Sequence, residues 1–177
     1  MDDEDAADWA SLSAGDPAGL ARLFDRHAAQ LFRHAARLLT DREDAKDAVA
    51  IAFFELWRKR NTVRLVGGSP LPWLLNTVAN CARNLERSGR RYRSLLGRVP
   101  GERSAGAPTA ADESGALAAL KRLPPKEQSV VVLTIMHGYH ETEAASALGI
   151  PVGTVKSRLA RAKSRLRGQL DQIGIVQ

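Results

Sequence analysis

Basic side chains gather at two places in the sequence. Residues 152–170 contain six Lys and Arg residues and no acid, and residues 83–98 contain six arginines against Glu86 alone. The chemistry that such clusters favour is the binding of a polyanion such as a nucleic acid. Because the two clusters are well separated along the chain, they predict two separate contacts with that partner.

Signatures of catalysis and of metal binding are missing from the sequence. It contains no P-loop, no GxSxG, no HExxH and, with Cys81 as its only cysteine, no disulfide framework and no CxxC pair. His27 and His34 stand seven residues apart, on one face of a predicted helix, where a packed or surface role is expected. We therefore expect no enzyme, no cofactor and no metal site.

The bulk composition limits the class of protein further. The chain has 177 residues and a net charge of +6, and its first 16 residues carry six acids and no base. This length suits one large domain or two small ones. No apolar run approaches the roughly 20 residues that span a membrane, and an acidic N-terminus is not a secretory signal. The sequence predicts a cytoplasmic protein without membrane insertion.

Helix signals position the first basic cluster. Asp16 before Pro17 is typical of a helix start, and residues 40–43 (TDRE) fit a capping box that begins a second helix. Gly67 and Gly68 mark a loop, after which Ser69 can cap a third helix that continues into the arginine-rich stretch. We expect this helix to present arginines along its second half.

The second half of the chain begins after a segment of small and polar residues. Residues 100–115 are poor in large apolar side chains, which predicts a flexible linker. Helical patterns resume near residue 116, interrupted at Pro124–Pro125, Gly138 and Gly149. The predicted fold is all-α, with two small helical domains joined by a flexible linker.

The layout of residues 141–167 is that of a helix-turn-helix. Small alanines allow two helices to approach, and Gly149 supplies the left-handed turn between them. In the second helix Val155, Leu159, Ala162 and Leu166 share one face, which leaves the basic residues on the other. A helix of this kind fits the major groove of double-stranded DNA.

Two sequence strings carry a family resemblance. LPPKE at 123–127, followed by LGIPVGTVKSRLARA at 148–162, resembles region 4 of the extracytoplasmic-function (ECF) sigma factors. Residues 44–58 and 73–84 resemble region 2 of the same family. The resemblance implies an acidic N-terminal tail at 1–15, a region 2-like domain at 16–98, a flexible linker at 99–115 and a region 4-like helix-turn-helix domain at 116–172.

The resemblance also implies partners and site residues. A sigma factor binds core RNA polymerase and promoter DNA and directs promoter recognition and DNA opening, and such proteins are often held by an anti-sigma factor. The residues it places on the minus-thirty-five element are Thr154, Lys156, Ser157, Arg158, Arg161 and Arg165. Those it places on the minus-ten element are Asn61, Thr62, Asn80, Arg83, Asn84 and Arg87.

Polymerase contacts are where the sequence departs most from the family. The resemblance assigns these contacts to Asp44, Asp47, Ile51 and Glu55, but Ala50 and Ile51 replace the usual glutamine and acid. This replacement predicts a weaker or more apolar contact with the polymerase clamp, or a contact of Ile51 with another partner such as an anti-sigma factor.

A second class of protein uses the same helix-turn-helix. A response-regulator-type transcriptional activator would normally add a receiver domain with a parallel sheet, and residues 16–98 show no alternating strand pattern. Transcription with purified core polymerase separates the two classes, because only a sigma factor makes the core enzyme initiate at a defined start site.

Overall fold

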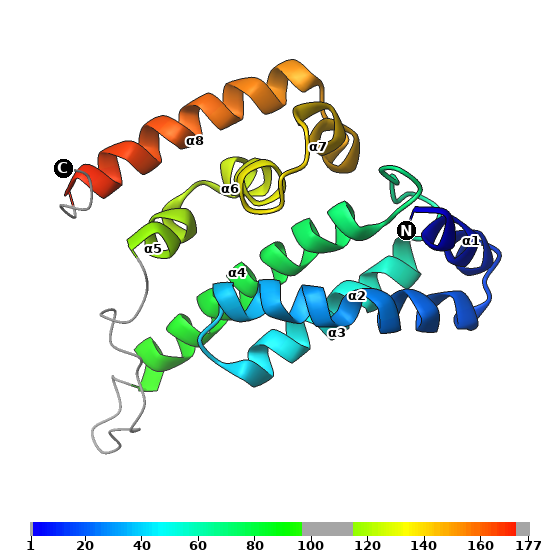
Figure 1. Ribbon diagram of the computed structural model, residues 1–177. Coiled ribbons are helices and arrows are strands. Elements are labelled where there is room, and N and C mark those ends of the chain that lie inside the picture. Colours follow the sequence, from blue (N-terminus) through cyan, green and yellow to red (C-terminus); the bar gives the residue numbers. More distant parts are fainter. Residues whose placement is uncertain (1, 97–114, 173–177) are drawn as a thin grey trace.

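The computed structural model describes residues 2–96 and 115–172, which fold into helices and connecting turns (Figure 1). The helices, in chain order, are α1 (Asp2–Ser13), α2 (Pro17–Leu38), α3 (Arg42–Lys59), α4 (Leu71–Leu96), α5 (Gly115–Arg122), α6 (Pro125–Val131), the π-helical turn η1 (Val132–Met136), α7 (Glu141–Leu148) and α8 (Val152–Gln172). The all-α expectation is confirmed, while residues 99–114 of the expected linker lie outside the described residues.

Residues 2–96 form the first unit of the protein, and two of its helices begin at a side-chain cap. The Asp16 carboxylate accepts from the backbone N–H of Ala18 at 2.9 Å, with Pro17 in the first position of α2. Helix α3 is capped by Asp41, which accepts from the Glu43 N–H at 2.7 Å. The cap therefore lies one residue later than predicted, because the Asp41 carboxylate takes the Glu43 N–H that residue 40 was expected to hold.

The acidic segment at the N-terminus is an ordered helix rather than a tail. Helix α1 packs against α2, with Leu12 fully buried between them. The helices come together at Gly19, where a Cβ atom would lie 2.6 Å from both the Asp8 carbonyl oxygen and the Leu12 nitrogen. Arg22 and Arg26 of α2 lower the pKa of Asp8 through hydrogen bonds, so the acids of α1 are paired with bases of the next helix.

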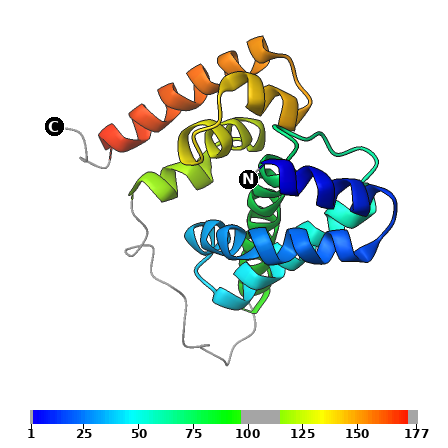
Figure 2. The same ribbon diagram turned by 45° about the vertical axis from the view of Figure 1, so that its right-hand side comes forward.

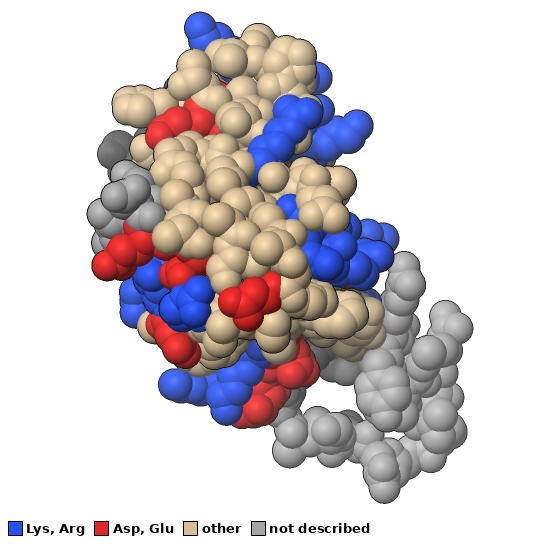
Figure 3. Space-filling view, turned by 90° about the vertical axis from the view of Figure 1, so that its right-hand side faces the viewer, with Lys and Arg blue, Asp and Glu red and all other residues tan. Residues whose placement is uncertain are grey.

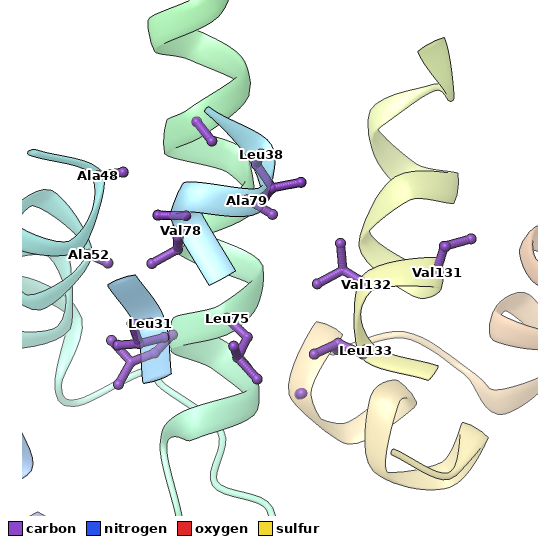
Figure 4. Close-up of a cluster of buried hydrophobic side chains, with 14 of the residues drawn as sticks. Leu31, Leu38, Ala48, Ala52, Leu75, Val78, Ala79, Val131, Val132 and Leu133 are labelled. Carbon is purple, nitrogen blue, oxygen red and sulfur yellow. The ribbon is translucent and has the colours of Figure 1, made fainter. Parts of the chain in front are cut away.

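Helix α4 occupies the centre of the molecule. Leu31 of α2 and Val78 of α4 pack on one flank, and Val132 and Leu133 of η1 lie on the other flank near Leu75 (Figure 4). These five side chains are fully buried. The apolar side chains of the two units thus form one continuous cluster, with α4 shared between them.

Residues 115–172 form the second unit. Its helix α6 and the turn η1 lie between α4 and α8 (Figures 1 and 2). The sequence predicts one helix from Pro125 toward Gly138, and the structure has that helix with a π-helical last turn. Gly138 ends it with a φ of 73°, a left-handed conformation that a residue without a Cβ adopts readily. Helix α8 then packs across α6 and α7.

Within residues 2–96 and 115–172, no helix combines the length and the apolar character needed to cross a membrane.

We predict that Gly19→Ala destabilises the protein, because the added methyl group meets backbone atoms that cannot yield. The expected loss is about 1–3 kcal/mol of unfolding free energy, measured by urea denaturation. Gly168→Ala is the matched control, because nothing lies within 4 Å of its Cβ position and alanine favours a helix. An unchanged midpoint for Gly19→Ala would show that α1 does not need this close approach.

Candidate nucleic-acid interface

The turn between α7 and α8 has the backbone that a helix-turn-helix requires. Gly149 adopts φ 66° and ψ 36°, and the Ile150 N–H bonds the Ala145 carbonyl at 3.1 Å. At the start of α7, the Glu143 carboxylate accepts from the His140 N–H at 2.7 Å. The carboxylate three residues into the helix therefore compensates for the absence of Ser or Thr at its start.

Helix α8 is divided into an inner and an outer face. Val155, Leu159 and Ala162 are buried against the second unit, as the spacing predicts. Lys156, Ser157 and Arg161 are exposed on the other face, Arg158 is half-buried, and Thr154 is half-buried in the first turn. In the upper half of the surface shown in Figure 3, Lys and Arg gather along the right-hand side. The exposed side of α8 is therefore basic, with Glu141 of α7 at its edge, 4.0 Å from the Lys156 Nζ.

Several of the predicted α8 contacts are partly committed to the protein itself. The Arg165 Nε lies 3.2 Å from a carboxylate oxygen of Glu127, whose side chain is buried under α8. The Arg161 Nε donates to the Ser157 carbonyl at 3.2 Å, along the exposed surface. Arg165 therefore ties α8 to α6, while Arg161 stays exposed at the surface.

The predicted minus-ten residues of α4 do not all face solvent. Asn84 and Arg87 are exposed, but Asn80 and Arg83 are half-buried. The Arg83 guanidinium donates to the Asn80 side-chain oxygen and, at 2.7 Å, to Oε1 of Gln128 in α6. A residue of the second unit therefore bonds Arg83, which the sequence predicts to contact DNA.

The loop between α3 and α4 places two further predicted residues at the surface. Asn61 and Thr62 are exposed, and the Thr62 hydroxyl donates to the Lys59 carbonyl at 3.0 Å. Since a helix rises about 1.5 Å per residue, Asn80 lies about 14 Å along α4 from Leu71, where the loop ends. The loop residues Asn61 and Thr62 are thus separated from Asn80 along α4 and do not form one cluster with it.

Polar contacts join the two units around Arg83. Lys121 of α5 pairs with Glu86 of α4 at 2.7 Å. On another part of this boundary, His137 Nε2 lies 3.1 Å from His34 Nδ1. The two units therefore contact each other, with α5, α6 and η1 lying over α2 and α4. We call this the closed arrangement.

The residues predicted to contact polymerase lie on helix α3. Ile51 is 40% exposed and Asp47 is exposed, whereas Asp44 is half-buried. Glu55 is half-buried and pairs with Arg58 and Lys59, and these hydrogen bonds lower its pKa to about 2. The face therefore combines an apolar side chain with carboxylates.

Comparison with known protein families assigns both units. Residues 23–92 match the model described as "Sigma-70 region 2", and residues 116–166 match "Sigma-70, region 4". The sequence is 36% identical over 165 residues to the ECF RNA polymerase sigma factor SigM of Mycobacterium tuberculosis, covering 92% of this chain and 82% of that protein. The chain belongs to the ECF RNA polymerase sigma factors. It is also 29% identical over 171 residues to SigL of the same organism, covering 93% and 96% of the two chains.

A sigma factor is not an enzyme, and its role is to direct RNA polymerase to promoters. The match of residues 23–92 to region 2 separates this chain from response-regulator activators, which share only the helix-turn-helix. Among solved structures, the chain is similar to CnrH in its complex with the cytosolic domain of CnrY, with a TM-score of 0.61 and 26% identity over 96% of this chain and 98% of that one. Its fold is also similar to that of RpoE in complex with the anti-sigma factor NepR from Bartonella quintana, with a TM-score of 0.53 and 24% identity over 85% of this chain and 96% of that one.

Several residues of this sigma factor gain their significance only from the structure. Gln128 lies 45 residues from Arg83 in the sequence, so their contact could not be foreseen. Phe54 is 63% exposed beside Ile51, although an aromatic residue in an apolar stripe is normally expected to be buried. The signal that was available for Phe54 is the FF pair at 53–54, because only one of two successive helix residues can face the core.

The His34–His137 contact predicts a pH dependence of the closed arrangement. Burial and the neighbouring His137 lower the pKa of His34 to about 3, and burial and Arg37 lower the pKa of His137. The closed state therefore favours neutral imidazoles, while an open or unfolded chain takes up protons below about pH 6.5. Closure should weaken as the pH falls from about 6.5 toward 3.

Small-angle X-ray scattering between about pH 7.5 and pH 5 measures this effect, and the expected result is a larger radius at the lower pH. In the double variant His34→Gln and His137→Gln, the pH dependence of the radius should be reduced. His140→Gln, which removes an exposed histidine, should behave as the unmodified chain does. A radius that does not change over this range would contradict the assignment.

Proposed function

We propose that this sigma factor reads its promoter at two places, using residues 16–98 for the minus-ten element and residues 116–172 for the minus-thirty-five element. The observation that carries the proposal is the exposed side of α8, where Lys156, Arg161 and Lys163 stand on a helix whose other side is buried against the second unit. Lys156, Ser157 and Arg161 contact base edges in the major groove, while Thr154 and Arg158 hold phosphates. Arg165 adds a phosphate contact from its exposed side.

The minus-ten element is bound as a separated strand. Asn84 and Arg87 are exposed on α4, where an amide can bond an unpaired base edge and a guanidinium can hold a phosphate. Asn61 and Thr62 of the loop contact a base that has left the stack. Opening of the DNA is then driven by binding energy and needs no covalent step.

Binding of DNA along α4 requires the closed chain to open. Two of the five N–H donors of Arg83 are directed to Asn80 and Gln128, and these bonds compete with a phosphate for the guanidinium. We propose that polymerase separates the two units and that Arg83 and Asn80 then turn to the promoter strand.

The outer face of α3 is the proposed contact with the polymerase clamp. Ile51 and Phe54 supply apolar area, and Asp44, Asp47 and Glu55 supply carboxylates. This composition supports a more apolar contact than the glutamine and acid of the family would make. The protein acts in the cytoplasm, where its polymerase and promoter are.

An anti-sigma factor is the remaining proposed partner. Support comes from CnrH, a protein of similar structure that was solved with the cytosolic domain of CnrY bound to it. An inhibitor that contacts both units and stabilises their closed arrangement would keep Arg83 from DNA without covering every base-reading residue.

Run-off transcription over a genomic library, with purified core polymerase and start-site mapping, tests the proposed function. The full chain should produce transcripts with defined starts, and the absence of any transcript that depends on the chain would overturn the proposal.

The variants Lys156→Ala and Arg161→Ala should each weaken binding to the mapped minus-thirty-five duplex. The expected loss is about 1–3 kcal/mol, or roughly 5- to 150-fold in Kd, if each side chain reads a base. Fluorescence anisotropy at fixed salt measures it. Arg33→Ala removes the same charge from an exposed position on α2 and should leave Kd almost unchanged. Equal losses in all three variants would indicate charge alone rather than base reading.

The double variant Ile51→Ala and Phe54→Ala should weaken the binding of core polymerase. Each side chain is expected to contribute at most about 1.5–3 kcal/mol when it is covered by the partner. Titration of labelled sigma factor with core enzyme measures the change. Lys46→Ala, on the same helix and 61% exposed at its side chain, is the control. An unchanged affinity of the double variant would place the clamp contact elsewhere.

A further inference from the structure

The carboxylate of Asp5 in α1 is bonded by two other parts of the first unit. Arg26 Nη1 donates to it at 2.6 Å and His27 Nε2 lies 2.9 Å from it, both from α2. The hydroxyl of Ser69, at the end of the loop before α4, also donates to it. Asp5 is 3% exposed, His27 5% and Ser69 8%, so the cluster is closed to water.

Ser69 has a second role, at the start of α4. Its oxygen accepts from the Leu71 N–H at 3.2 Å, which satisfies an unpaired donor of the first turn. One side chain therefore joins α1 to the end of the loop and to the first turn of the helix that carries the minus-ten residues. We call this chain of contacts, from Asp5 through Ser69 to Leu71, the α1 latch.

The latch holds the loop at its last turn. Val66 and Ser69 exchange two backbone hydrogen bonds of 3.0 Å, which close a tight turn over Gly67 and Gly68. Both glycines have positive φ, 59° and 80°, as such a turn requires. At the other end, the Thr62 and Val63 N–H groups bond the Lys59 carbonyl. The loop is thus held at one end by Lys59 of α3 and at the other by Ser69, so its path between them depends on both points.

Removing one member of the cluster therefore affects the others. A buried carboxylate is stable only while donors surround it, so α1, α2 and the loop must keep their mutual positions to satisfy Asp5. Ser69 is the only donor among the three that belongs to the loop, and it lies 64 residues from Asp5 in the sequence. Its bond to α1 is thus a tertiary constraint on the loop and not part of the local turn.

We propose that Asp5 and Ser69 are positioning residues for base selection at the minus-ten element: the α1 latch fixes the loop whose exposed residues, Asn61 and Thr62, contact the unstacked base. The inference rests on the proposed function of that loop. Asp5 touches no DNA in this scheme and acts through Ser69 alone. Helix α1 is then part of the promoter-reading apparatus, although it lies outside the matched region 2 segment, which begins at residue 23.

The test is a selection for promoter binding by holoenzyme. Core polymerase with full-length sigma factor is mixed with fork-junction templates that are randomised across the minus-ten element, and the retained templates are sequenced. In Ser69→Ala, preference at the position read by the loop should fall on the order of fivefold, as expected for one lost hydrogen bond of ordinary strength. Preference at the other positions and affinity for the minus-thirty-five duplex should not change.

Three further variants make the result interpretable. Ser69→Thr keeps the hydroxyl and should restore the preference. Ser11→Ala removes a hydroxyl in α1 that also bonds a carboxylate, that of Asp16 at 2.6 Å. This variant should have no effect on preference. Asp5→Asn should reproduce Ser69→Ala, and its melting temperature shows whether the fold survives, so a purely structural loss would lower binding at all positions equally.

The outcomes separate the latch from the loop. The double variant Asn61→Ala and Thr62→Ala removes the proposed base contacts directly. If it changes preference at one position while Ser69→Ala does not, the latch is overturned and the loop function stands. If it changes nothing, the proposed function of the loop fails and the inference fails with it.

Discussion

Burial of helix α4 is the constraint on which the rest of the structure depends. Leu74, Leu75, Val78, Ala79 and Ala82 are each at most 3% exposed. At 100° per residue, these positions cover an arc of about 140°, which is wider than one packed neighbour conceals. Helices α2 and α3 cover one flank and η1 with α6 covers the other. The closed arrangement follows because α2 and α3 leave one apolar side of α4 uncovered, and η1 with α6 buries it. The polar contacts of Arg83 and His34 lie at the edge of that buried area.

The parts of the fold that sequence predicted were those with local signals. Asp16, Gly149 and the Val155–Leu159–Ala162 stripe each act within a few residues, and each is found as expected. Helix α1 was not foreseen, since six acids in 16 residues indicate a solvated tail. What orders α1 is a set of bases 14 to 22 residues away, and their pairing with Asp8 and Asp5 depends on tertiary structure.

The candidate site likewise contains residues that the sequence predicts and one whose state depends on tertiary contacts. The basic face of α8 follows from periodicity alone, so its residues could be identified from the sequence. The state of Arg83 could not, because Gln128 is 45 residues away and the contact exists only when the two units meet. Arg83 thus has two alternative partners, Gln128 inside the protein and, in the proposed function, a phosphate of the promoter. Whatever stabilises one contact competes with the other, so polymerase, DNA and an inhibitor all act on one equilibrium.

The shared core also has a consequence for synthesis on the ribosome. Helix α4 is complete before any residue of η1 has been made, and translation proceeds at roughly 5–20 residues per second. For several seconds the nascent first unit therefore carries Leu75 and Ala79 uncovered beside its basic surface. In that interval the flank is open to chaperones, or to another nascent chain, before η1 arrives to cover it. The order in which the chain emerges thus makes the newly made protein vulnerable to aggregation along a flank of α4 that is buried once folding is complete.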